Sequence, residues 1–176
     1  NHQPDIIIIG GGLAGLVSAI HLSKAGLSVT LIEKSEYPKH KVCGEYISNE
    51  VLPYLQHLGA DPMIIGARKI TRFLLSTIRG KITETVLPLG GFGVSRYALD
   101  LFLMQKAIET GCTVIHDTVT DVIFANDSFS VSTKEGNTCT AKIAIGAFGK
   151  RSNMDIKMDR GFIHNKSPFV AVKTHM

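Results

Sequence analysis

A glycine-rich turn between an apolar run and a helical segment constrains this chain more than any other feature of its sequence. The turn, Gly10 to Gly15, reads GGGLAG and follows the continuous apolar run Ile6 to Ile9. Such a run, without polar alternation, is typical of a parallel strand that is buried on both faces. In a strand-turn-helix unit of this kind the three motif glycines permit a tight turn, close approach of a diphosphate and close helix packing. The spacing therefore predicts a Rossmann-like βαβ unit that binds a dinucleotide.

The start of the helix that follows the turn is the expected anion site. Free N–H groups and the positive end of the helix dipole both favour negatively charged oxygens at a helix N-terminus. We expect the diphosphate of the cofactor to lie against the following residues: Gly10, Gly12, Leu13, Ala14 and Gly15.

Glu33 ends the second strand-like run, Ser28 to Glu33. An acid about 20 residues after the glycine motif binds the ribose hydroxyls of FAD or NAD, whereas NADP needs a cation there for its extra phosphate. Lys34 is adjacent, but Glu33 occupies the discriminating position. We therefore expect FAD or NAD in preference to NADP, with Glu33 and Lys34 at the adenosine end of the site.

The middle of the chain predicts a hairpin and a helix. Between Lys69 and Leu89, β-branched residues are frequent and Gly80 separates two candidate strands, which indicates an antiparallel hairpin. Ser95 to Thr110 has helical spacing of apolar residues, with Ser95 as its expected N-cap. An earlier helix is expected over Ser48 to Leu58.

After Gly111 the pattern changes to four short strand-like runs that predict a β-meander, the last returning beside the first strand. The whole is an α/β fold: a Rossmann-like FAD/NAD(P)-binding domain with a parallel sheet, a β-meander crossover and an inserted β-hairpin. We expect residues 1–68 and 91–160 to form the cofactor domain. Residues 69–90 and 161–176, the latter with a nascent strand at its end, would begin a substrate domain whose remainder is missing.

Composition excludes several classes of protein. The chain has 176 residues, an apolar fraction of 44% and a net charge of +4, with Lys and Arg scattered, which gives nucleic-acid binding little support. Cys43, Cys112 and Cys139 lack metal-ligand or disulfide spacing, so we expect no metal site and a reducing, cytoplasmic location. No run is long enough to span a membrane, and peripheral membrane contact stays open.

Several separated segments together resemble the FAD-dependent monooxygenase and geranylgeranyl reductase superfamily. They are the opening βαβ unit, "KVCGEYIS", "GFGVSRYALDLFLMQKAIETGC" and "IAIGAFGKRS", and the resemblance runs from Asp5 to about Arg151. It implies that the cofactor is FAD and that Arg96 lies near the flavin's ribityl and phosphate groups, where a guanidinium binds phosphate in a fixed fork. The alternative for Arg96 is an ion pair with Asp100, one helical turn away.

The resemblance also implies further site residues. The loop Lys41 to Glu45 would pass the flavin, with Cys43 and Gly44 giving close backbone approach. Cys43 is a candidate catalytic thiol, with a packed, unreactive cysteine as the alternative. Val119 matches the strand residue whose backbone meets the adenine.

One departure from the family pattern concerns the segment Ala147-Phe148-Gly149, where the family has an acid in place of Phe148. Ala147 and Gly149 are still expected at the cofactor. In many hydroxylases of the family that acid helps to organise the handling of the pyridine nucleotide. Its replacement by Phe148 therefore weakens the expectation that NADH or NADPH reduces the flavin directly.

The sequence therefore predicts a FAD-dependent oxidoreductase of monooxygenase or reductase type. Reduced flavin would either activate oxygen to hydroxylate an organic substrate or reduce an isoprenoid double bond, with NADH or NADPH as possible electron donor. The alternatives are a non-catalytic dinucleotide-binding module and an NAD-dependent dehydrogenase. Substrate and oligomeric state stay open.

Overall fold

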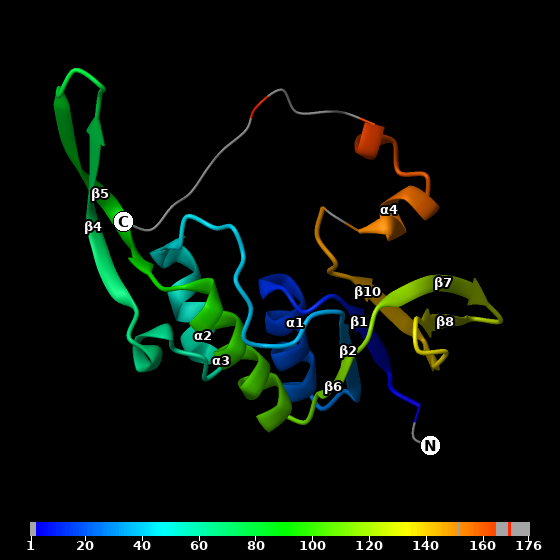
Figure 1. Ribbon diagram of the computed structural model, residues 1–176. Coiled ribbons are helices and arrows are strands. Elements are labelled where there is room, and N and C mark those ends of the chain that lie inside the picture. Colours follow the sequence, from blue (N-terminus) through cyan, green and yellow to red (C-terminus); the bar gives the residue numbers. More distant parts are fainter. Residues whose placement is uncertain (1–2, 151, 165–168, 170–176) are drawn as a thin grey trace.

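A four-stranded parallel sheet forms the centre of the fold. The computed structural model describes residues 3–150, 152–164 and 169 of the chain. The strand order is β10-β1-β2-β6, and every pair is parallel (Figure 1). The strands are β1 (Ile6–Ile9), β2 (Val29–Glu33), β6 (Thr113–His116) and β10 (Ile143–Gly146). β10 returns beside β1, which confirms that expectation.

Alternate residues of β1 enter two separate cores, which explains its unbroken apolar sequence. Ile6 and Ile8 pack in the core beneath the helices, and Ile7 and Ile9 pack in a second core on the other face of the sheet. The helix side holds α1 (Leu13–Lys24) and α3 (Arg96–Glu109), which lie against each other (Figure 1). The Ser95 hydroxyl accepts a hydrogen bond from the Ala98 amide at 3.2 Å and so caps α3 as predicted.

The second face of the parallel sheet is covered by an antiparallel meander. Its strands are β7 (Val119–Ala125), β8 (Ser128–Thr133) and β9 (Thr138–Ala141), in the order β7-β8-β9. The first run after Gly111 is β6 of the parallel sheet, so the prediction that the meander begins there was wrong. The fourth run divides into β9, which belongs to the meander, and β10, which returns to the parallel sheet as predicted. The chain bends at Lys142, between β9 and β10, where it passes from one sheet to the other.

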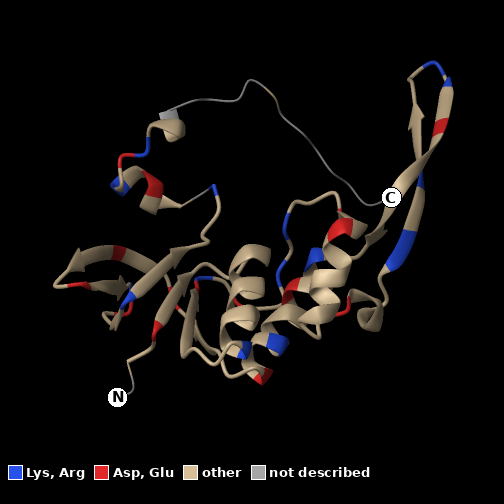
Figure 2. Ribbon diagram, turned by 180° about the vertical axis from the view of Figure 1, so that it is seen from behind, with Lys and Arg blue, Asp and Glu red and all other residues tan. Residues whose placement is uncertain are grey.

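A long hairpin projects from the body, as the sequence predicted (Figure 1). It consists of β4 (Arg68–Ser76) and β5 (Ile82–Gly93), with β3 (Tyr46–Ser48) paired to the base of β5. Gly80 takes a positive φ of 77° in its turn. Figure 2 shows that the Lys and Arg residues of the described part are distributed over the hairpin, the loops and the helices.

The remaining elements are short. The helix expected from Ser48 is divided into the 3-10 helix η1 (Asn49–Val51) and α2 (Leu52–His57), with Pro53 tolerated in the first turn of α2. η2 (Pro62–Ile65), α4 (Asn153–Lys157) and η3 (Gly161–His164) complete the list. The predicted C-terminal strand lies outside the described residues apart from Phe169. No helix in the described part is both long and apolar enough to cross a membrane.

Candidate dinucleotide-binding site

The turn after β1 requires glycine at two positions. Gly10 has a φ of 103°, and a Cβ added to it would lie 2.6 Å from the Ala147 carbonyl oxygen at the end of β10. A Cβ on Gly15 would overlap the carbonyl oxygen of Gly10. Both residues therefore let the turn fold tightly between β1, β10 and α1, as the motif predicted.

Gly12 differs from them because nothing surrounds its side-chain position. It is the N-cap residue of α1, and a Cβ built on it would meet no atom within 4 Å. No side chain caps this helix end, and the first turn of α1 contains no acid. The amides of Gly12, Leu13 and Ala14 thus keep the helix end available to an anion, and the cradle fits the diphosphate of a dinucleotide.

Glu33 lies beside this turn and is attached to it. Its Oε2 accepts a hydrogen bond from the Gly11 amide at 2.7 Å, and its Oε1 accepts one from the Ser35 amide at 3.0 Å. Burial alone would raise the pKa of Glu33, but hydrogen bonds from Lys39 and from the Gly11 amide outweigh it and hold the pKa below its ordinary value. The acid is therefore ionised and fixed, as a carboxylate that accepts ribose hydroxyls should be.

Two residues that the sequence did not indicate complete this corner. The Lys39 ammonium lies 2.6 Å from Oε1 of Glu33 and 4.5 Å from the centroid of the Tyr37 ring. The Tyr37 hydroxyl donates a hydrogen bond to the Gly11 carbonyl. Burial lowers the pKa of Lys39, and the Glu33 carboxylate opposes that shift. The loop after β2 therefore covers Gly11 and leaves Gly12 open.

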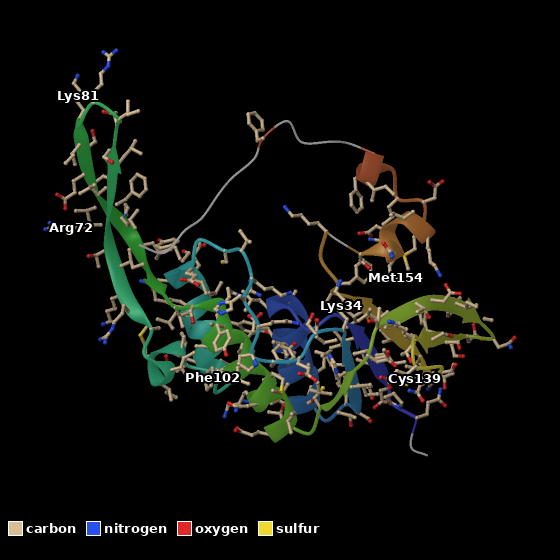
Figure 3. All side chains as sticks on the ribbon, viewed as in Figure 1. Lys34, Arg72, Lys81, Phe102, Cys139 and Met154 are labelled. Carbon is tan, nitrogen blue, oxygen red and sulfur yellow. The ribbon has the colours of Figure 1, made fainter. Side chains whose placement is uncertain are left out.

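A pocket of about 170 Å³ lies next to the turn and joins four of the predicted residues. Gly10, Glu33, Lys34 and Val119 all line it, although Gly10 follows β1, Glu33 and Lys34 stand at the end of β2, and Val119 begins β7. Phe148, Asn153 and Met154 line it too. Figure 3 shows Lys34 and Met154 on the side of the molecule that carries the meander. The volume is below the 300–1,000 Å³ range of sites for whole drug-sized ligands, so it suits one part of a dinucleotide.

Arg96 lies at the start of α3 and pairs with Asp100. Its Nε and Nη2 donate to the two carboxylate oxygens of Asp100 at 2.7 and 2.8 Å, and Asp100 is fully buried. The hydrogen bonds to Asp100 are the main cause that raises the pKa of Arg96, with a smaller contribution from Cys43. The Arg96–Asp100 ion pair, which was the alternative expected from the sequence, is thus present. Contact between the remaining guanidinium donors of Arg96 and a flavin stays a prediction.

Of the described residues, the other predicted ones do not line this pocket. Cys43 accepts a hydrogen bond from the Glu45 amide at 3.4 Å, and Gly44 borders a separate cavity of about 470 Å³ beside Ser95. Lys41 is exposed. At the end of β10 the Ala147 amide donates to Ile9, and Gly149 has a positive φ of 70°.

Comparisons with known proteins agree with this geometry. Residues 5–44 match the family described as FAD dependent oxidoreductase. The chain is 34% identical over 112 residues to digeranylgeranylglycerophospholipid reductase 2 of Methanopyrus kandleri, a match that covers 62% of this chain and 27% of the relative. It is 32% identical over 163 residues to digeranylgeranylglycerophospholipid reductase 1 of Methanosphaera stadtmanae, which covers 89% of this chain and 40% of the relative.

The fold is also similar to that of CmlS, a flavin-dependent halogenase. The TM-score is 0.77 and the sequence identity 26%, over 90% of this chain and 31% of that structure. The chain spans less than half the length of all three proteins.

Proposed function

Because the chain belongs to the superfamily of FAD-dependent oxidoreductases, we propose that it holds FAD in an enzyme that reduces a double bond of an isoprenoid lipid. The observation that carries this proposal is the pairing of an open helix end at Gly12 with a fixed carboxylate at Glu33. An anion-binding helix end and a ribose-binding acid at this spacing are what a dinucleotide needs.

The residues of the chain have separate tasks in this proposal. The amides at the start of α1 bind the diphosphate, and Glu33 orients the adenosine ribose. Bound FAD would supply the isoalloxazine ring that takes up and passes on a hydride. Arg96, held by Asp100, and the loop with Cys43 and Gly44 would lie on the ribityl and flavin side.

The choice of an isoprenoid reductase over a hydroxylase rests on the two archaeal relatives, both named digeranylgeranylglycerophospholipid reductase. We propose that the hairpin residues 69–90, together with residues 161–176, belong to a substrate domain distinct from the cofactor domain of residues 1–68 and 91–160. The hairpin projects from the side of the molecule that is remote from the meander, which supports a separate role for it (Figure 1). NADH or NADPH remains the proposed electron donor.

The test is a visible spectrum of the purified full-length protein, followed by anaerobic turnover. Bound FAD gives flavin absorbance, and dithionite-reduced enzyme should convert a geranylgeranyl lipid to a product that is two mass units heavier per reduced double bond. A product heavier by one oxygen, formed only in air, would indicate hydroxylation instead. A protein that neither retains nor binds FAD would overturn the proposal.

A further inference from the structure

The outer part of the β4–β5 hairpin is a two-stranded ribbon. β3 pairs with β5 at Gly91 to Gly93 only, so beyond this base the two strands of the hairpin pair with each other and with no further strand of the described part. Figure 1 shows the tip of the ribbon far from the parallel sheet. A ribbon of two strands is marginally stable in water by itself, so a surface that covers its side chains would stabilise it.

Both faces of this ribbon expose apolar side chains. Side chains alternate along a strand, so Phe73 and Leu75 point to one face and Leu74 to the other, and all three are exposed. Ile82, which is also exposed, lies opposite Ser76 and therefore on the face of Leu74. A contiguous exposed apolar surface of this kind is typical of a site that contacts a protein or a membrane. A flat protein partner would cover one face, whereas a medium that surrounds the ribbon covers both.

The turn at the tip combines an apolar side chain with two cations. Ile78 is completely exposed, and Arg79 and Lys81 follow it in the same turn. Figure 3 shows Lys81 at the tip of the hairpin. In a bilayer interface, long basic side chains keep their charged ends at the head groups while their stems and apolar neighbours lie deeper. The composition of the turn fits this arrangement.

The hairpin carries the positive charge of the chain. Of the 19 Lys and Arg and the 15 Asp and Glu residues of the sequence, five and one lie in residues 68–93. The rest of the chain therefore has equal numbers of acids and cations, and the hairpin accounts for the whole net charge of +4. Its single acid, Glu84, pairs with Arg72 at 2.9 Å and so does not neutralise the cations of the tip. The tip is thus complementary to a negatively charged surface.

We propose that the tip of the β4–β5 hairpin docks on an anionic phospholipid bilayer. Ile78 and the apolar side chains of both faces enter the interface, and Arg79 and Lys81 bind lipid phosphate groups. A bilayer covers both faces and supplies negative charge, whereas a second copy of the chain would bring the same cations to the contact. The inference goes beyond the proposed function and does not depend on it, because docking requires neither bound FAD nor an isoprenoid.

The experiment measures co-sedimentation of the full-length protein with vesicles of phosphatidylcholine alone and with vesicles that also contain phosphatidylglycerol. We expect binding to the anionic vesicles, with a marked loss at high salt because exposed charges are screened. The double variant Arg79→Gln/Lys81→Gln should bind about tenfold or more weakly, since each cation near an anionic surface contributes about fivefold. Ile78→Ser should weaken binding about tenfold through the loss of a buried apolar side chain.

Matched controls come from the opposite side of the molecule. Lys134→Gln/Lys142→Gln removes the same charge from exposed positions in and after the meander, and Ile123→Ser removes an exposed apolar side chain of β7. Neither should change vesicle binding by more than about twofold, because both lie beyond the reach of screened charges at the tip. Equal losses in the tip variants and in these controls would contradict the proposal.

A fluorescent reporter gives a second measurement. The 176 residues contain no Trp, so the difference in emission between Ile78→Trp and wild type reports the tip. It should move to shorter wavelength when anionic vesicles are added, and the corresponding difference for Ile123→Trp should not. An unchanged Ile78→Trp emission would overturn the proposal even if the other variants do not fold, which thermal unfolding verifies.

The remaining outcomes separate this proposal from its alternatives. Wild-type protein that binds neither kind of vesicle, or both kinds equally, would overturn it. If vesicles are not bound and light scattering shows a dimer that Ile78→Ser dissociates, the hairpin contacts a second copy of the chain instead. Retention of FAD, read from the visible spectrum of the same samples, tests the proposed function separately.

Discussion

The Glu33 carboxylate accepts the Gly11 amide hydrogen bond at 2.7 Å, across 22 residues of sequence. The acid at the end of β2 and the turn at the end of β1 are therefore one rigid unit. β1 and β2 are parallel neighbours, with Ile9 opposite Ile32, so their carboxyl ends meet at the same edge of the sheet. A cofactor that touches both groups finds them already in place.

The substitution Gly12→Ala should weaken binding of the cofactor without destabilising the fold. Gly12→Ala places a methyl group in open space, so the free energy of unfolding should change by less than about 0.5 kcal/mol. The methyl group would nevertheless occupy the approach of the diphosphate, and loss of hydrogen bonds to a charged group should weaken FAD about tenfold or more. Calorimetry and urea unfolding measure the two effects.

Gly15→Ala is the matched comparison for Gly12→Ala. Its methyl group overlaps the Gly10 carbonyl, so the helix must move away from the sheet, at a cost of about 1–3 kcal/mol in unfolding free energy. Equal stabilities of the two variants would contradict the different roles assigned to the two glycines.

Removal of the Glu33 carboxylate should weaken binding of the cofactor more than removal of a neighbouring acid does. Glu33→Ala deletes the proposed acceptor for the ribose hydroxyls. A hydrogen bond to a charged group contributes about 1.5–3 kcal/mol, so its loss should raise the Kd for ADP about tenfold or more. Glu36→Ala is the control, since Glu36 has a side chain that is 85% exposed. An ADP affinity that is the same in both variants would remove Glu33 from the site.

The Lys39–Glu33 ion pair should show strong coupling in a double-mutant cycle. Lys39→Met leaves the buried Glu33 carboxylate without its cation and should lower the unfolding free energy by about 2 kcal/mol. Adding Glu33→Gln removes the uncompensated charge, so the two effects should differ from additivity by about 1 kcal/mol or more. The exposed pair Arg72–Glu84, treated identically as Arg72→Met and Glu84→Gln, should couple by less than that.

The stability of the protein should depend on Glu33 at acid pH. Its folded-state pKa is lowered, so its contribution is present above the unfolded value of about 4.3 and is lost as pH falls through the lower folded pKa. The difference in unfolding free energy between wild type and Glu33→Gln should be constant near neutrality and shrink below about pH 4. Urea titrations from pH 7 to pH 3 measure it, and a difference that grows on acidification would contradict the lowered pKa.

Local patterns were sufficient to predict the elements that hold the site. The GGGLAG turn, the apolar run of β1 and the position of Glu33 are short-range signals with fixed spacing, and the structure brings Gly10, Glu33, Lys34 and Val119 to one pocket. The hairpin and the Ser95 cap follow from equally local preferences.

Tertiary packing decided the features that the sequence did not predict. Tyr37 and Lys39 lie in a polar loop without periodicity, and their contacts with Gly11 and Glu33 depend on how that loop folds back. Phe148 departs from the family pattern in the sequence, but only the packing around Gly146 places its ring in the pocket wall. Likewise, the division between β9 and β10 depends on which sheet each run joins.

The double burial of β1 has a consequence for dynamics. Ile7 and Ile8 have no exposed surface and are anchored in different cores, so the amides of β1 should exchange with deuterium only through global unfolding. The hairpin, whose apolar side chains are largely exposed, should exchange through local opening. When a nucleotide docks at the end of so immobile a strand, the protein loses little conformational entropy there, and tight binding needs no closing motion at that end.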